Sequence, residues 1–162
     1  MLLQKIFHVH RNLAETKAQM TNLHNFRRHL EGVNKATVTA DGIAQFDFNA
    51  GKFHGHFVAV ELPTEDPNQV LFKSTAGNVD VAGLIEFFEI RPGLTEVQVT
   101  AEYSISSPLH HLVNLFTAGF DRFLNRQLRR LQCALDGAPM AVPALKKQSL
   151  RGWAAQLPLL AH

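Results

Sequence analysis

The chain has 162 residues, a formal net charge of +2, and 46% hydrophobic against 19% charged residues. This length fits one domain, and the apolar content excludes a chain that is disordered throughout. No run reaches the ~18 apolar residues that a membrane-spanning helix needs, and the start of the chain lacks the layout of a secretory signal. The single cysteine excludes an internal disulfide. We therefore expect a cytoplasmic protein.

The first part of the chain predicts one strand followed by two short helices. Apolar and polar residues alternate over residues 2–10, as in a strand with one buried face. Over residues 12–30 the apolar spacing becomes helical, and Gly32 supplies a stop. Because the polar pair Thr21-Asn22 interrupts this stretch, we expect two helices rather than one.

Five or six strands follow, separated by turn residues such as Asp41-Gly42. The last of them is the clearest, because Val97, Val99 and Ala101 alternate with polar residues. This alternation indicates an antiparallel sheet with one covered face. The predicted strands cover residues 35–40, 43–49, 53–62, 69–75, 84–91 and 95–105.

A long helix is predicted to end the domain. Ser107 suits its N-cap, Pro108 its first position and Gly137 the residue after its last turn. The stretch between them would run about 44 Å at 1.5 Å per residue. The predicted fold class is therefore α+β, with a curved antiparallel sheet of six or seven strands around one C-terminal helix. Because one helix covers a twisted sheet only partly, we expect an internal space between them.

The expected lining of this space is apolar and aromatic. A packed core without a ligand would use the same residue types, so both interpretations stay open. Gly119 lies inside the helix, where glycine costs about 1 kcal/mol relative to alanine. It makes room for a ligand or a crossing strand, or it bends the helix. The candidate ligand-binding residues are Phe46, Phe48, Phe57, Phe72, Val99, Ala101 and Tyr103 from the strands and Leu112, Phe116, Gly119, Phe120 and Phe123 from the helix.

Candidates for chemistry are few. Tyr103 is a weak catalytic candidate on the dry face of its strand, with Asp47, Glu86 and His54 as potential partners. The histidine pairs of the chain have no obvious inward carboxylate beside them, so no metal site is predicted. The sequence contains no nucleophile elbow, phosphate loop or dinucleotide fingerprint, and no cofactor is expected.

We divide the chain into a domain over residues 1–137 and a tail over residues 138–162. The tail is basic and amphipathic and contains Trp153. Three interpretations stay open for residues 139–162: contact with an anionic membrane surface, docking on the domain or on another copy of the chain, and disorder. The net charge is too small to indicate nucleic acid as a partner.

The pattern over about residues 3–136 resembles the SRPBCC superfamily, also called the START or helix-grip superfamily. Three stretches carry the resemblance: AETKAQMTNLHNF at residues 14–26, GLIEFFEI at 83–90 with PGLTEVQV at 92–99, and Ser107-Pro108 before the long helix. The polyketide cyclase/dehydrase and coenzyme-Q-binding members are similar over residues 103–135. The carbon monoxide dehydrogenase subunits of this superfamily are similar around residues 51–57.

The resemblance implies a hydrophobic cavity between the sheet and the long helix. It implies a lipid, isoprenoid quinone, sterol or polyketide as ligand, and it carries over no catalytic residue. The main hypothesis is a non-enzymatic binding or carrier protein for such a molecule. The alternatives are a cyclase or dehydratase that acts on a polyketide-like substrate, and an assembly or membrane-recruitment module that uses residues 139–162.

Overall fold

The structure is a computed structural model that describes residues 1–22, 28–106 and 113–137, without the side chains of residues 113–117. Its strands and helices, in chain order, are β1 (Leu2–Val9), α1 (Leu13–Met20), β2 (Val33–Val38), β3 (Ala44–Ala50), β4 (Phe53–Leu62), β5 (Gln69–Gly77), β6 (Val79–Arg91), β7 (Leu94–Ile105) and α3 (Val113–Asp136).

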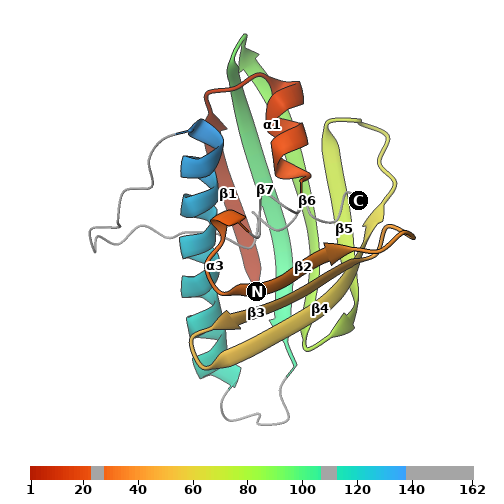
Figure 1. Ribbon diagram of the computed structural model, residues 1–162, viewed down its shortest axis with the longest axis vertical. Coiled ribbons are helices and arrows are strands. Elements are labelled where there is room, and N and C mark those ends of the chain that lie inside the picture. Colours follow the sequence, from red (N-terminus) through yellow and green to blue (C-terminus); the bar gives the residue numbers. More distant parts are fainter. Residues whose placement is uncertain (23–27, 107–112, 138–162) are drawn as a thin grey trace.

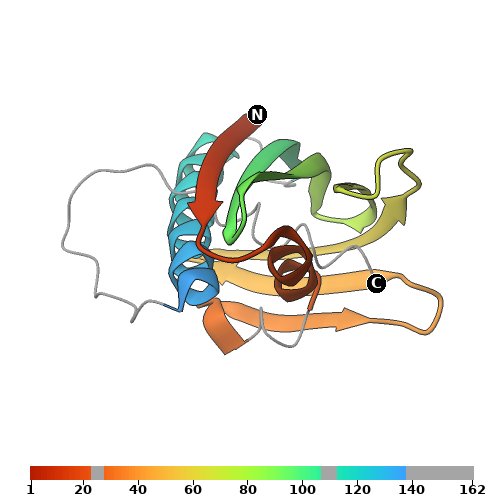
Figure 2. The same ribbon diagram turned by 90° about the horizontal axis from the view of Figure 1, so that it is seen from above.

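All seven strands form one antiparallel sheet in the order β1-β7-β6-β5-β4-β3-β2. Six of them follow one another along the chain, and β1 joins the sheet beside β7, where Leu3 pairs with Ala101. The sheet curls into a half-barrel that wraps around the two helices (Figures 1 and 2). α3 contacts β1, β7, β3 and β4, and α1 contacts β6 and β7. The predicted α+β helix-grip fold is confirmed.

The concave face of the half-barrel is apolar because each strand alternates between buried and exposed residues. In β3, Phe46 and Phe48 are buried whereas Asp47 between them is partly exposed. In β7, Val99, Ala101 and Tyr103 follow the same pattern, as the sequence predicts. The buried faces of the strands and the buried stripe of α3 form one continuous hydrophobic core.

Three predicted elements differ from the structure or lie outside it: β2, which covers Val33–Val38 rather than residues 35–40, β6 and the second short helix. β6 begins at Val79 rather than at residue 84, because Gly77, with a φ of 123°, makes a tight connection from β5. The second short helix falls mainly on residues 23–27, and the predicted N-cap of the long helix falls on Ser107; both lie outside the described residues. Gly137 has a φ of 67° directly after α3, as expected of a helix-ending glycine.

Hydrogen bonds to two distant segments hold the C-terminal half of α3. Gln127 is fully buried, and its side-chain amide accepts from Glu31 N at 2.9 Å and donates to Glu31 O at 2.7 Å. Further along, the Arg11 guanidinium donates to Leu135 O, and Asp136 Oδ1 accepts from His10 N at 2.8 Å. These contacts fix which side of α3 faces the sheet.

Neither described helix has the length and apolarity needed to cross a bilayer.

Candidate ligand site between the sheet and the long helix

An aromatic cluster fills the space between α3 and the β3–β4 side of the half-barrel. Phe48 lies at its centre, with ring centroids 5.4 Å from Phe120 and 5.3 Å from Phe123. Phe46 and Phe57 stack on each other at 4.5 Å. The cluster therefore joins strand and helix through direct ring contacts. Its members are Phe46, Phe48, Phe53, Phe57, Phe120 and Phe123.

Two strand glycines allow aromatic rings to lie flat against the sheet. Gly55 pairs with Phe48 across the β3–β4 ladder, and a Cβ atom at Gly55 would lie 2.2 Å from Phe48 Cζ. Gly83 pairs with Phe72 across the β5–β6 ladder, and a Cβ atom there would lie 2.4 Å from Phe72 Cζ. Each ring thus occupies the volume that a neighbouring side chain would otherwise take.

A chain of three polar side chains borders the aromatic cluster on the β7 side; we call it the polar trio. The Tyr103 ring contacts Phe120 edge to face at 5.2 Å, and its hydroxyl donates to Asp121 Oδ1 at 3.3 Å. Asn125 Nδ2 donates to Asp121 Oδ2, also at 3.3 Å. Asp121 and Asn125 lie one helical turn apart, so both project toward the same side of α3.

Burial and the neighbouring carboxylate keep Tyr103 in its neutral form. Burial is the larger cause, and the negative charge of Asp121 with its hydrogen bond adds to it; together they raise the pKa of Tyr103 well above its ordinary value. A neutral phenol is a hydrogen-bond donor rather than a base. Tyr103 therefore donates its hydrogen bond to Asp121 Oδ1, and Asp121 is the charged member of the polar trio.

One atom of the polar trio has no partner. Asn125 is 6% exposed, and its Oδ1 is the one buried side-chain nitrogen or oxygen among the described residues without a hydrogen bond. Leaving a buried acceptor unpaired costs about 1–3 kcal/mol. Such an atom in a protein interior needs an explanation, and a donor supplied by a ligand or a water is one.

Among the residues whose side chains are described, none fills the volume beside Gly119, which directly precedes Phe120 of the aromatic cluster. Among the described residues, the nearest atom that a Cβ at Gly119 would meet is Ala50 O, at 4.0 Å. This differs from Gly55 and Gly83, where rings already occupy the corresponding volume. The nearest described atom belongs to the last residue of β3, so a ligand, the passage of β3 and a helix bend all stay open as reasons for the glycine.

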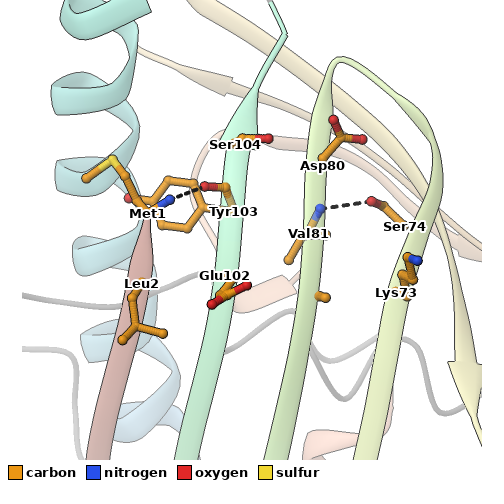
Figure 3. Close-up of a pocket in the computed structure, with 10 residues that line it drawn as sticks. Met1, Leu2, Lys73, Ser74, Asp80, Val81, Glu102, Tyr103 and Ser104 are labelled. Atoms are coloured by element: carbon orange, nitrogen blue, oxygen red, sulfur yellow. Dashed lines mark hydrogen bonds between the residues drawn. The ribbon is translucent and has the colours of Figure 1, made fainter.

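A depression of about 590 Å³ lies over the sheet end at which β1 begins and β7 ends (Figure 3). The ladder between β5 and β6 stops at the pair Lys73–Ala82, and beyond it Ser74 Oγ accepts from Val81 N at 2.8 Å. The strands separate from this point, which opens the depression. Its lining residues are Met1, Leu2, Lys73, Ser74, Asp80, Val81, Ala82, Glu102, Tyr103 and Ser104. The Asp80 and Glu102 carboxylates of this lining are matched by the Lys73 ammonium and the amino terminus of Met1, so its formal charge is balanced.

The structure brings together most of the residues nominated from the sequence. The nominated strand residues are buried on the concave face, and Phe120 and Phe123 of α3 face them. Gly119 is half-buried beside them. Leu112 lies outside the described residues, and Phe116 lies in α3 with a side chain that is not described. Contact of these residues with a ligand stays a prediction.

The partners proposed for Tyr103 are wrong. Asp47 lies on the convex face within 3.4 Å of His54, which is itself exposed, and Glu86 Oε1 accepts from Gln69 on the same outer side at 3.0 Å. Strand alternation places Asp47, His54 and Glu86 on the opposite face from their inward-facing neighbours Phe48, Phe53 and Ile85. Among the described residues, no three His, Cys, Asp or Glu side chains form a group that would hold a metal ion.

Sequence reasoning missed Asp121, Asn125 and Phe53. The first two lie one turn apart and directly follow Phe120 and Leu124 of the buried stripe. That spacing is a usable signal, because a carboxylate and an amide at i and i+4 beside a buried stripe form a polar edge that faces the protein interior. Phe53 begins β4 and contacts Phe48 and Phe120.

The sequence matches no family model and no curated protein. Solved structures resemble the fold at low identity. The Zhui aromatase/cyclase from Streptomyces sp. R1128 has a TM-score of 0.66 at 8% identity and covers 85% of this chain and 92% of its own. A START superfamily protein from Mycobacterium smegmatis has a TM-score of 0.62 at 14% identity, with 84% and 94% covered.

A point mutant of norcoclaurine synthase from Thalictrum flavum, in complex with a transition-state analogue, has a TM-score of 0.53 at 11% identity and covers 74% of this chain and 88% of its own. These proteins share the half-barrel and the long terminal helix with the present chain, whereas identities this low carry no information about the ligand. The chain therefore has the START-type helix-grip fold.

Proposed function

We propose that this protein binds a hydrophobic small molecule between the sheet and α3 and acts as a binding or carrier protein. The observation that carries the proposal is the open space beside Gly119 at the border of the aromatic cluster. Lipids, isoprenoid quinones and polyketide-like molecules are the ligand classes that suit an apolar, aromatic lining. The likeness to an aromatase/cyclase and to a synthase with a bound analogue supports a small-molecule site in this fold.

The free energy of binding would come from apolar burial. A ligand that buries about 300 Å² of apolar surface gains about 7 kcal/mol at about 25 cal/mol per Å². The costs of association and of ordering are subtracted from this gain. Ring contacts with Phe120 and Phe53 would add to it for an aromatic ligand.

Extraction tests the proposal directly. The full chain is purified without detergent and extracted with organic solvent, and the extract is analysed by mass spectrometry. We expect an apolar compound at a stoichiometry near one. A clean extract, together with no binding of any compound from a panel of lipids, quinones and polyaromatics, would refute the proposal.

A matched pair of variants then locates the site. Gly119→Leu fills the open space beside the aromatic cluster, whereas Ala118→Leu adds a side chain of the same size to the neighbouring exposed position of α3. We expect the first variant to lose at least about tenfold in affinity, equivalent to about 1.4 kcal/mol, and the second to bind like the unmodified protein. Equal affinity of both variants would place the ligand elsewhere.

The polar trio favours a second candidate function, an enzyme of the cyclase or dehydratase type. Asp121 would accept a proton from the carbon beside a carbonyl, and Tyr103 would donate one to the departing hydroxyl, with water as the second product. Loss of water from an aromatic β-hydroxyketone produces a conjugated enone, which absorbance detects. Asp121→Asn should abolish such activity. Absence of turnover with the unmodified protein over a panel of these ketones would leave the carrier function alone.

A further inference from the structure

The unpaired oxygen of Asn125 says something about the chemistry of the ligand. The Asn125 side chain is almost fully buried, and Tyr103 and Phe120 connect it to the aromatic cluster through the polar trio. Its Oδ1 is an acceptor without a donor. A wholly apolar ligand would leave this oxygen unpaired, and the penalty of burial would remain.

Asn125 cannot remove the penalty by turning its amide over. Its Nδ2 donates to Asp121 Oδ2, and a carboxylate only accepts. Exchanging the two ends of the amide would place oxygen against oxygen. Asp121 is in turn held by the Tyr103 hydroxyl on its other oxygen. The polar trio therefore fixes Asn125 so that its oxygen points away from Asp121.

A single trapped water is the competing partner for Asn125 Oδ1, and it would need further bonds to groups that already have a partner, such as the Asp121 carboxylate. A buried water usually makes two to four hydrogen bonds to polar groups that would otherwise be unpaired. The described residues offer no second unpaired buried side-chain nitrogen or oxygen beside Asn125 Oδ1. A donor that is covalently attached to a larger apolar molecule needs only the one acceptor, because the rest of the molecule is held by apolar contacts.

We infer that the ligand of this protein carries a hydroxyl or N–H group that donates to Asn125 Oδ1, while its apolar body lies against the aromatic cluster. This rests on the proposed binding function and makes it narrower: the ligand is an apolar alcohol, phenol or amine derivative rather than a hydrocarbon or a fully capped ester. Tyr103 and Asp121 act as positioning residues, because they hold the Asn125 amide in place.

Three probes of the same shape test the inference on the full chain. Naphthol carries a donor, methylnaphthalene replaces it with a methyl group, and methoxynaphthalene keeps the oxygen but lacks the donor. Equilibrium dialysis should give naphthol an affinity about tenfold above that of the other two, as expected for one hydrogen bond to an otherwise unpaired group. Equal affinities for all three would overturn the donor requirement and leave the binding function standing. Binding of none of them, together with a clean extract in the test above, would refute both.

A matched pair of variants assigns the donor contact to Asn125. Asn125→Leu keeps the approximate shape and removes the acceptor, so naphthol should fall to the affinity of methylnaphthalene, whose own affinity should not change. Arg126→Leu makes a substitution at the neighbouring exposed position of α3, leaves the polar trio in place, and should keep the preference for naphthol. A preference that survives in Asn125→Leu would overturn the inference. If Asn125→Leu fails to fold, the comparison of naphthol with methoxynaphthalene on the unmodified protein decides the donor requirement by itself.

Discussion

Replacing Gly55 by alanine is expected to destabilise the fold by about 2–3 kcal/mol, the upper part of the range for an overfilled core. The new Cβ would lie 2.2 Å from Phe48 Cζ and within 2.8 Å of two further atoms of that ring. Phe48 has no simple way to move, because Phe120 and Phe123 stack on it from α3 and Phe57 contacts it from β4. The ring or the strand must shift, and either movement disturbs the wall of the candidate site.

Urea denaturation of four variants measures this effect: Gly55→Ala, Gly119→Ala, Phe48→Leu and the double variant Gly55→Ala with Phe48→Leu. Gly119→Ala is the control with the opposite sign: its Cβ meets open space among the described residues, and removing a glycine from a helix should stabilise by about 1 kcal/mol. In the double variant with Phe48→Leu, the smaller side chain at residue 48 should recover part of the cost of Gly55→Ala. A loss below about 1 kcal/mol for Gly55→Ala, or strict additivity in the double variant, would contradict the packing of Phe48 on Gly55.

Three further predictions concern the helix, the tyrosine and the tail. Phe120→Ala should cost about 3–5 kcal/mol in urea denaturation, because the ring is fully buried among aromatic neighbours; a cost near zero would contradict its central position. Because folding raises the pKa of Tyr103, the folded state holds this proton more tightly. The associated stability should be complete below pH ~10 and decline above it by at most about 1.4 kcal/mol per pH unit. Tyr103→Phe should remove this part of the decline, and identical high-pH profiles would refute the assignment. In the tail, Lys146→Glu with Lys147→Glu should weaken co-sedimentation with anionic vesicles, and unchanged sedimentation would remove the membrane interpretation of residues 139–162.

The inward-facing residues of a strand could be predicted where one face of the strand is exposed to solvent and the other is buried. β7 alternates throughout, so its inward residues were identified correctly. β6 shows the limit of this reasoning. Gly77 and Gly83 both look like turn signals in the sequence, but Gly77 makes the turn with a positive φ, whereas Gly83 lies in the strand against the Phe72 ring. Whether a glycine makes a turn or lies inside a strand depends on which side chain of the neighbouring strand faces it. For Gly83 this side chain is Phe72, and the register between β5 and β6 sets the pairing.

The polar trio could be predicted only in part. Tyr103 was identified because a polar ring stands on a dry strand face. Its partner Asp121 lies 18 residues later on α3, and the rotation of that helix decides whether it faces β7 or solvent. Asp47 and Glu86 were poor candidates for a simple reason: each directly neighbours an inward-facing residue, so alternation sends it outward.

Two features indicate where a ligand would enter: the positions of the polar contacts that hold α3, and the position of the open space beside Gly119. Most of the described polar contacts that tie α3 to other segments lie in its C-terminal half. Gln127 holds Glu31 through two hydrogen bonds, Arg130 Nη2 lies 2.6 Å from Glu31 Oε2, and Leu135 O accepts from Arg11. The open space lies at Gly119, nearer the other end. Separating the helix from the sheet at its C-terminal half would break these bonds and expose buried polar groups. A small outward movement near Gly119 would break one long hydrogen bond, from Tyr103 to Asp121 at 3.3 Å, besides apolar contacts of the described residues. We therefore expect entry at that end and a ligand whose donor group reaches Asn125 from there.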